Sequence, residues 1–170
     1  DPGILVSTEE AFKGEHSLKF QDDASNDKDW RPHMSFDNSF DPGILQASMD
    51  VFLEDGAIFW HEWREPGGSP YKVGPSFKFE ASGDVVVNGK KIGSVPRKKW
   101  IHVEITFENG SKTGSWDLAL TVEGGARANY EGLRCVVNDF ESVETLIWSS
   151  TATVKTAFYL DNVRFKVDKK

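Results

Sequence analysis

The stretch ILQASMDVFLED, residues 44–55, decides the fold class, because apolar and polar side chains alternate along it with a period of two. Leu45 and Met49 fall on one face, whereas Gln46 and Ser48 fall on the other. This alternation is typical of a β-strand that has one face in the core and one toward solvent.

The same alternation recurs along the chain, in residues 100–107 and again in residues 116–122. Asn88-Gly89 supplies the two positive-φ residues that a type I′ hairpin turn needs, and no segment shows a sustained helical stripe. The pattern predicts an all-β chain of about ten or more strands, because half-apolar strands must bury one face each. We expect a two-sheet antiparallel β-sandwich, a jelly roll, as a single domain over residues 1–170.

Composition narrows the function classes. The 170 residues are 38% hydrophobic, which suits one domain with a sizeable core. A net charge of -7 disfavours nucleic-acid and anionic-membrane partners, and no apolar run is long enough for a membrane span. The single cysteine, Cys135, excludes an internal disulfide framework and is expected to be buried. A start at Asp1 favours a piece excised from a larger multidomain protein.

The stretch IFWHEWREPGGSPY, residues 58–71, concentrates aromatic and charged side chains. As a strand it places His61 and Trp63 on one face. If the opposite face is in the core, these two residues line the open sheet face, with Arg64 at the strand end and Tyr71 on the following loop. The alternative is that both tryptophans of the stretch are packing residues and that Arg64 pairs with a neighbouring glutamate.

Polar and aromatic residues of other strands would extend this face into a groove, namely Lys78, His102, Glu104 and Trp148. Sugars suit such a face, because their C–H faces stack on aromatic rings and their hydroxyls bond planar polar groups. The Lys, Arg and His content favours an acidic or sulfated polysaccharide, whose anionic groups match a guanidinium fork. The alternative is an ordinary solvated outer face.

A second candidate region is KDWRPHMSF, residues 28–36, where Trp30, Arg31 and His33 cluster beside a proline. These residues would either form the rim of a ligand groove or belong to a plain loop in which Trp30 covers the edge of the core.

Four segments together resemble jelly-roll carbohydrate-binding modules and concanavalin-like or laminin-G-like sandwiches. They are AFKGEHSLKF (11–20), FDPGILQASMDVFLED (40–55), PRKKWIHVEITFENG (96–110) and AFYLDNVRFKV (157–167). The resemblance implies a secreted or cell-surface domain that binds a polysaccharide or oligosaccharide. It also implies a catalytic domain covalently linked in the parent chain.

The resemblance further implies a structural calcium ion. Asp161, in YLDNV, lies where similar modules hold this ion, together with groups of the first strand near Glu15. Calcium takes six to eight oxygen ligands, many of them backbone carbonyls.

The rival to a binding module is an enzyme. HEWRE, residues 61–65, resembles the arginine-bearing strand of alginate-lyase-like sandwiches, but their Gln-x-His and Tyr-x-Lys-x-Gly strands are not matched. The Glu-x-Asp-x-x-Glu pattern of jelly-roll glucanases is absent from the sequence. A lyase base and a group that neutralises the substrate carboxylate could come from His61, Arg64, Tyr71 and Glu104. We therefore predict a non-catalytic polysaccharide-binding module, with a lyase, a glycoside hydrolase or a laminin-G-like protein-binding domain as alternatives.

Overall fold

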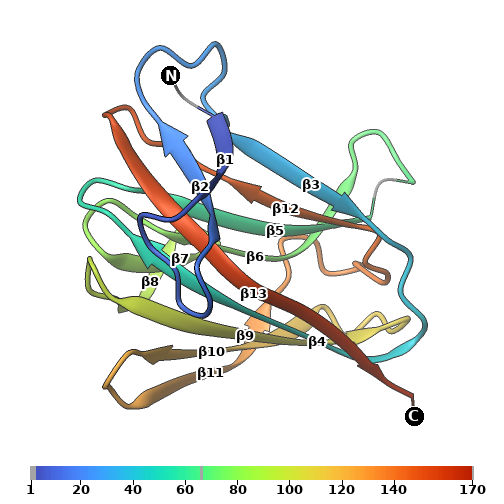
Figure 1. Ribbon diagram of the computed structural model, residues 1–170. Coiled ribbons are helices and arrows are strands. Elements are labelled where there is room, and N and C mark those ends of the chain that lie inside the picture. The colour runs from blue at the N-terminus through green and yellow to red at the C-terminus, as the bar shows by residue number, and fades with distance from the viewer. Residues whose placement is uncertain (1–2, 66, 170) are drawn as a thin grey trace.

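The computed structural model describes residues 3–65 and 67–169, which form two antiparallel sheets packed face to face (Figure 1). The described residues contain thirteen strands and no helix. The predicted all-β sandwich is therefore confirmed, and so is the estimate of ten or more strands.

Sheet A has the strand order β1-β2-β13-β4-β9-β10-β11. These strands are β1 (Gly3–Ser7), β2 (Ser17–Asp22), β13 (Thr156–Asp168), β4 (Gly43–Leu53), β9 (Trp100–Asn109), β10 (Ser115–Val122) and β11 (Arg127–Arg134). Sheet B has the order β3-β12-β5-β6-β7-β8. Its strands are β3 (His33–Asp37), β12 (Thr145–Ser149), β5 (Phe59–Glu65), β6 (Lys72–Phe79), β7 (Asp84–Val87) and β8 (Lys90–Ser94).

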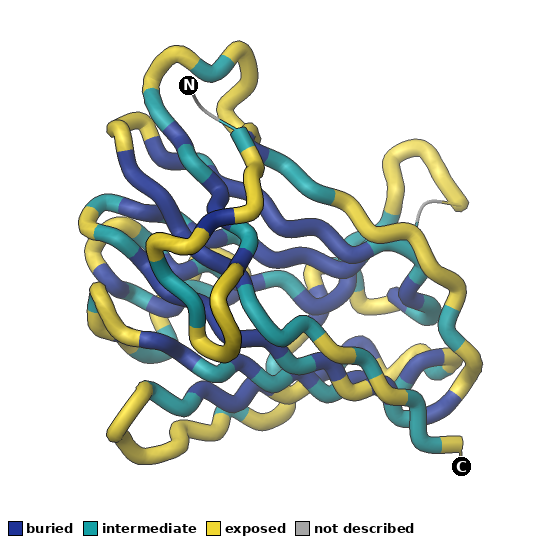
Figure 2. The backbone as a smooth tube through the Cα atoms, viewed as in Figure 1, coloured by how far each residue is buried: buried dark blue, intermediate teal, exposed yellow. Residues whose placement is uncertain are grey.

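The core lies between the two sheets and is built from the alternating apolar residues (Figure 2). Leu45 and Met49 of β4 are fully buried, as are Ile101 and Val103 of the neighbouring strand β9. Their polar neighbours consequently point to the outer face of sheet A, away from sheet B. Cys135 is also buried, as expected.

Turn chemistry follows the sequence signals closely. Asn88 and Gly89 join β7 to β8 with φ values of 48° and 74°, which confirms the predicted pair of left-handed residues. Asn109 ends β9 and is buried, with its amide group bonded to the backbone of Phe40, Asp41 and Val143. This side chain is therefore a structural element of the turn.

Within residues 3–65 and 67–169, no helix is both long and apolar enough to cross a membrane.

Candidate functional site

Strand β5 has the opposite orientation to the one predicted, because the face predicted to be open points into the core. His61 and Trp63 point into the core and are at most 1% exposed, whereas Trp60 and Arg64 lie on the outer face of sheet B. The prediction that His61 and Trp63 line the open face is wrong. The physical reason is that the other face carries the guanidinium of Arg64, which costs far more to place between the sheets than one neutral imidazole.

His61 is held in the core by two hydrogen bonds. Its Nδ1 lies 2.7 Å from the carbonyl oxygen of Ile147, and its Nε2 accepts from the indole N–H of Trp63 at 2.7 Å. These partners fix a neutral tautomer in which Nδ1 carries the proton. Burial lowers the pKa of His61 to about 3, because the charged form would lose its hydration.

Trp148, also predicted for the open face, belongs to the same buried cluster. Its ring centroid lies 5.0 Å from that of His61, and its indole N–H points to the sulfur of Met49 at 3.4 Å. Trp148 is 1% exposed, so it contributes packing and cannot contact a polysaccharide. Its neighbour Ile147 is on the outward side of β12, as is Ser149.

The strand register builds the outer face of sheet B from four strands. Ser149 of β12 lies opposite both His33 of β3 and Trp60 of β5, and Trp60 lies opposite Lys78 of β6. These four residues form one row across the sheet. The ammonium group of Lys78 lies 4.5 Å from the centroid of the Trp60 ring, which is a cation–π contact. Lys78 is therefore on the predicted face, although its predicted aromatic neighbour is not.

A pocket of about 330 Å³ opens on this face. Its lining residues come from strands β3, β12 and β5 and from two loops, and they are Trp30, His33, Trp60, Arg64, Tyr71, Ile147 and Ser149. The KDWRPHMSF region thus contributes to the rim, as one of its two interpretations expected. Trp30 is 42% exposed and does not cover the core.

Arg64 is fixed from two sides within the pocket. Its Nε donates to Oε1 of Glu62 at 2.5 Å, and its guanidinium carbon lies 4.3 Å from the centroid of the Tyr71 ring. The ion pair with Glu62 is the one that the alternative interpretation of this stretch expected. Desolvation raises the pKa of Glu62, and the hydrogen bond from Arg64 opposes that shift. No residue in the described part of the chain bonds the terminal Nη atoms of Arg64, so they can bind an anion.

His33 lies at the β3 side of the pocket, with its ring 5.1 Å from that of Trp30. Its pKa is lowered first by desolvation and then by the positive charges of Arg64 and Arg31. The imidazole is therefore neutral at neutral pH and can accept a proton.

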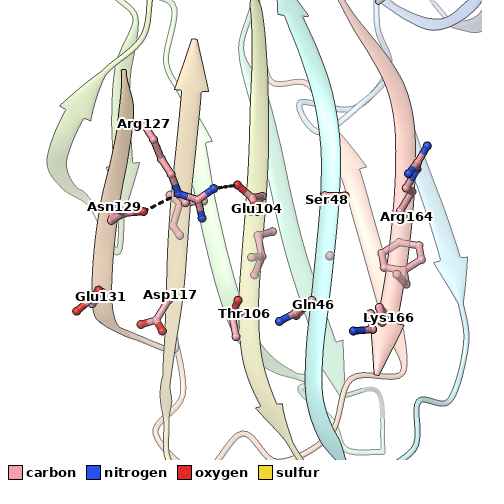
Figure 3. Close-up of a pocket in the computed structure, with 15 residues that line it drawn as sticks. Gln46, Ser48, Glu104, Thr106, Asp117, Arg127, Asn129, Glu131, Arg164 and Lys166 are labelled. Carbon is pink, nitrogen blue, oxygen red and sulfur yellow. Dashed lines mark hydrogen bonds and ion pairs between the residues drawn. The ribbon is translucent and has the colours of Figure 1, made fainter. Parts of the chain in front are cut away.

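The two remaining predicted residues, His102 and Glu104, lie on β9 and point to the outer face of sheet A, on the opposite side of the molecule from the pocket. Nδ1 of His102 lies 2.8 Å from the carboxylate of the buried Asp50. Glu104 is paired with Arg127, as Figure 3 shows. The structure therefore divides the predicted groove residues among the core and two outer faces, and only Arg64, Tyr71 and Lys78 remain together on one face.

Of the two predicted metal ligands, Asp161 is bonded to the backbone and Glu15 is exposed. Oδ2 of Asp161 accepts the backbone N–H groups of Phe12 and Lys13 at 3.0 and 3.1 Å, and Oδ1 accepts that of Asn162. Glu15 is exposed, and the described residues contain no group of three or more acidic, histidine or cysteine side chains that could hold a metal ion. Asp161 thus anchors the loop between β1 and β2, and the calcium ion stays a prediction.

Comparison with known proteins shows the fold. No protein-family model and no curated protein sequence matches the chain. Similar solved structures include a PL-14 alginate lyase from Aplysia kurodai, with a TM-score of 0.64 at 12% identity over 97% of this chain and 87% of that one. An endo-β-1,4-glucuronan lyase from Trichoderma reesei has a TM-score of 0.65, with the same identity and coverage. A carbohydrate esterase from the bacteriophage phi24B has a TM-score of 0.64 at 12% identity, covering 99% and 88%.

These neighbours confirm the jelly-roll, concanavalin-like resemblance. They also correct the prediction that the chain is not an enzyme. All three are named as carbohydrate-active enzymes, and two of them are polysaccharide lyases. The absence of the expected lyase motifs was the basis of that prediction. At 12% identity, however, strand positions can be kept while the residues on them change.

Proposed function

We propose that the chain is a polysaccharide lyase that binds an acidic polysaccharide on the outer face of sheet B and cleaves it by β-elimination. One observation carries the proposal. Arg64, held by Glu62 and stacked on Tyr71, shares a pocket with the neutral imidazole of His33. A carboxylate neutraliser, a proton acceptor and a phenol are thereby present in one open site.

The roles follow from the chemistry of the elimination. The Nη atoms of Arg64 bind the uronate carboxylate and neutralise the charge that opposes loss of the neighbouring proton. His33 takes the proton from C5 of the sugar. The electron pair of the broken C5–H bond then forms the C4–C5 double bond, and the C4–O bond breaks. The phenol of Tyr71 gives its proton to the leaving oxygen. The rings of Trp30 and Trp60 are placed to stack on sugars beside the cleavage point.

The alternative hydrolytic enzymes fit the pocket less well. A retaining glycosidase needs two carboxyl groups about 5 Å apart, and no carboxylate is among the lining residues of the described chain. An esterase needs an activated hydroxyl. The serine of the pocket, Ser149, is fully buried and its hydroxyl donates to the carbonyl of Trp30 at 2.5 Å. The elimination route is therefore favoured.

An acidic polysaccharide is too large to enter a cell, so a secreted or surface location accompanies this function as part of the proposal. The covalently linked catalytic domain that the resemblance implied stays a prediction.

The test is a product assay on polymannuronate, polyguluronate, glucuronan and polygalacturonate, with uncharged mannan as the blank. Elimination products are detected by the ultraviolet absorbance of their new double bond. We expect cleavage of at least one acidic polymer, and a rate reduced about 100-fold or more by Arg64→Ala, the range for loss of one group that stabilises developing charge.

Three further variants sharpen the test. Tyr71→Phe keeps the ring under Arg64 and removes only the hydroxyl, and His33→Gln removes the base, so both should lower the rate. Arg134→Ala, an exposed arginine of β11, should not change it. Unsaturated product from none of the acidic polymers, or an unchanged rate in a folded Arg64→Ala variant, would overturn the proposal.

A further inference from the structure

A second open groove lies on the other side of the molecule. It occupies about 540 Å³ on the outer face of sheet A and extends over strands β13, β4, β9, β10 and β11 (Figure 3). The outer face of sheet B is separated from it by the whole core. The groove contains no aromatic ring on its outward positions, so its chemistry differs from that of the first site.

The register explains why the face is hollow. One cross-strand row runs Arg164, Ser48, Glu104, Ala119 and Asn129, from β13 to β11. The side chains of β4 and β10 in this row are short, whereas the row begins with a long arginine. Figure 3 shows Arg164 at one margin of the groove, and the side chain of Arg127 reaching from β11 across β10 to Glu104. The short side chain of Ser48 therefore lies between two longer ones, those of Arg164 and Glu104, and the face is hollow there.

One end of this sheet face is covered by the chain itself. The loop between β1 and β2 is anchored by Asp161, and its Phe12 packs against Trp100 with ring centroids 5.6 Å apart. Trp100, Phe52 and Tyr159 form a small buried cluster beneath it. The loop stops short of the groove residues, which remain open beside it.

Charges in the groove are balanced. Three cations face three carboxylates, and these residues are Arg127, Arg164, Lys166, Glu104, Asp117 and Glu131. Arg127 pairs with Glu104, and its Nε donates to Asn129 at 2.9 Å. A polyanion would meet three carboxylates here in a protein whose net charge is -7. The groove therefore suits an uncharged ligand.

Several hydrogen-bonding groups of the groove have no partner within the described chain. They are the amide of Gln46, the hydroxyls of Ser48 and Thr106, and the guanidinium of Arg164. Hydroxyls, amides, carboxylates and guanidinium groups at close spacing match the alternating donors and acceptors of sugar hydroxyls.

We propose that this groove is a second binding site, which takes an uncharged, hydroxyl-rich oligosaccharide. It is independent of the proposed lyase site, because no residue is shared and the ligand charge differs. The expected ligand segment lies along the strands, with its hydroxyls on the floor residues and on the Arg127–Glu104 pair.

The test is amide-resolved NMR titration of the whole chain with cellopentaose, xylopentaose and mannopentaose, and with hexamannuronate as the acidic probe. At least one uncharged probe should shift the amide signals of β4, β9 and β10 and leave those of β5 and β12 in place. Ser48→Leu, which fills the floor and removes a hydroxyl, should weaken that binding about tenfold, or about 1.4 kcal/mol. Ser94→Leu, at an exposed position of β8, is the matched control and should bind as the unchanged chain does.

Arg164→Ala gives a second readout, because an exposed arginine can be removed without filling space, and it should also weaken binding. Arg64→Ala should leave binding of the uncharged probe intact even where it abolishes cleavage of acidic polymers. Shifts that map to β5 and β12, or an absence of shifts with all three uncharged probes, would overturn the second site without bearing on the lyase proposal.

Discussion

Strand β5 carries a tryptophan and a polar partner on each of its faces, yet the two faces serve different ends. Inside, Trp63 donates to His61, and the imidazole has no hydrogen-bonding capacity left for a ligand. Outside, Arg64 uses only its Nε on Glu62 and keeps the rest of its fork toward the pocket. A polar group beside a tryptophan is therefore available to a ligand only where the protein leaves some of its hydrogen-bonding atoms without a partner.

The largest expected effect separates the two tryptophans of this strand. Trp63→Ala should lower the free energy of unfolding by about 3–5 kcal/mol, because it leaves a cavity and removes the donor to His61. Trp60→Ala, on the half-buried outer face, should cost about 1 kcal/mol. Denaturant unfolding of both variants measures the difference. Equal losses of unfolding free energy in the two variants would contradict the difference in burial between the inner and outer faces of β5.

The fold could be predicted from the sequence, because alternation of side chains acts within one strand and turn residues act within a few positions. Leu45 and Met49 of the stretch 44–55 are buried, as the alternation predicts, and Asn88 and Gly89 both have the positive φ that the turn requires. Neither signal depends on which strands become neighbours.

The site could be predicted only in part, because strand β5 is aromatic on both faces and alternation alone cannot say which face is inside. The outward placement of Arg64 could have been inferred from charge, since burying a guanidinium costs more than burying the neutral imidazole of His61. The pairing of His33 with Ser149, and of Ser149 with Trp60, could not, because it depends on strands distant in sequence.

The second prediction concerns the pH dependence that the inner face creates. The pKa of His61 falls from 6.5 in the unfolded chain to about 3 in the folded one, so the unfolded state binds more protons between these values. Stability from this group is therefore complete above pH 6.5 and declines as pH falls, by up to about 1.4 kcal/mol per pH unit. Unfolding measured at pH 7 and pH 5 should differ by about 2 kcal/mol from this residue alone.

His61→Gln should flatten this slope, because a glutamine can bond both partners without taking a proton. His16→Gln, in an exposed loop, serves as the control and should keep the slope of the unchanged chain. A slope that survives His61→Gln would mean that the inner imidazole is not held neutral.

The third prediction addresses the outer face. The pKa of His33 is lowered by desolvation and by the charges of Arg64 and Arg31, so its titration by NMR should have a midpoint below 6.5. Arg31→Gln removes one repelling cation and should move that midpoint upward by a fraction of a pH unit. If His33 is the base, the acid limb of the cleavage rate should move in the same direction. A midpoint that moves while the rate profile stays fixed would remove His33 from the base role.

The smallest expected effect tests how far the outer site extends. Lys78 is half-buried on β6, lies over the Trp60 ring and is not among the residues that line the pocket. A single surface cation of this kind contributes only about 0.2–1 kcal/mol. Lys78→Ala should weaken binding of an acidic hexasaccharide about twofold and reduce its salt dependence, whereas Lys78→Arg should preserve both. A tenfold loss would instead place Lys78 among the central contacts. The ligand-binding surface would then include strand β6, and the contrast between the inner and outer faces of β5 would extend to that strand.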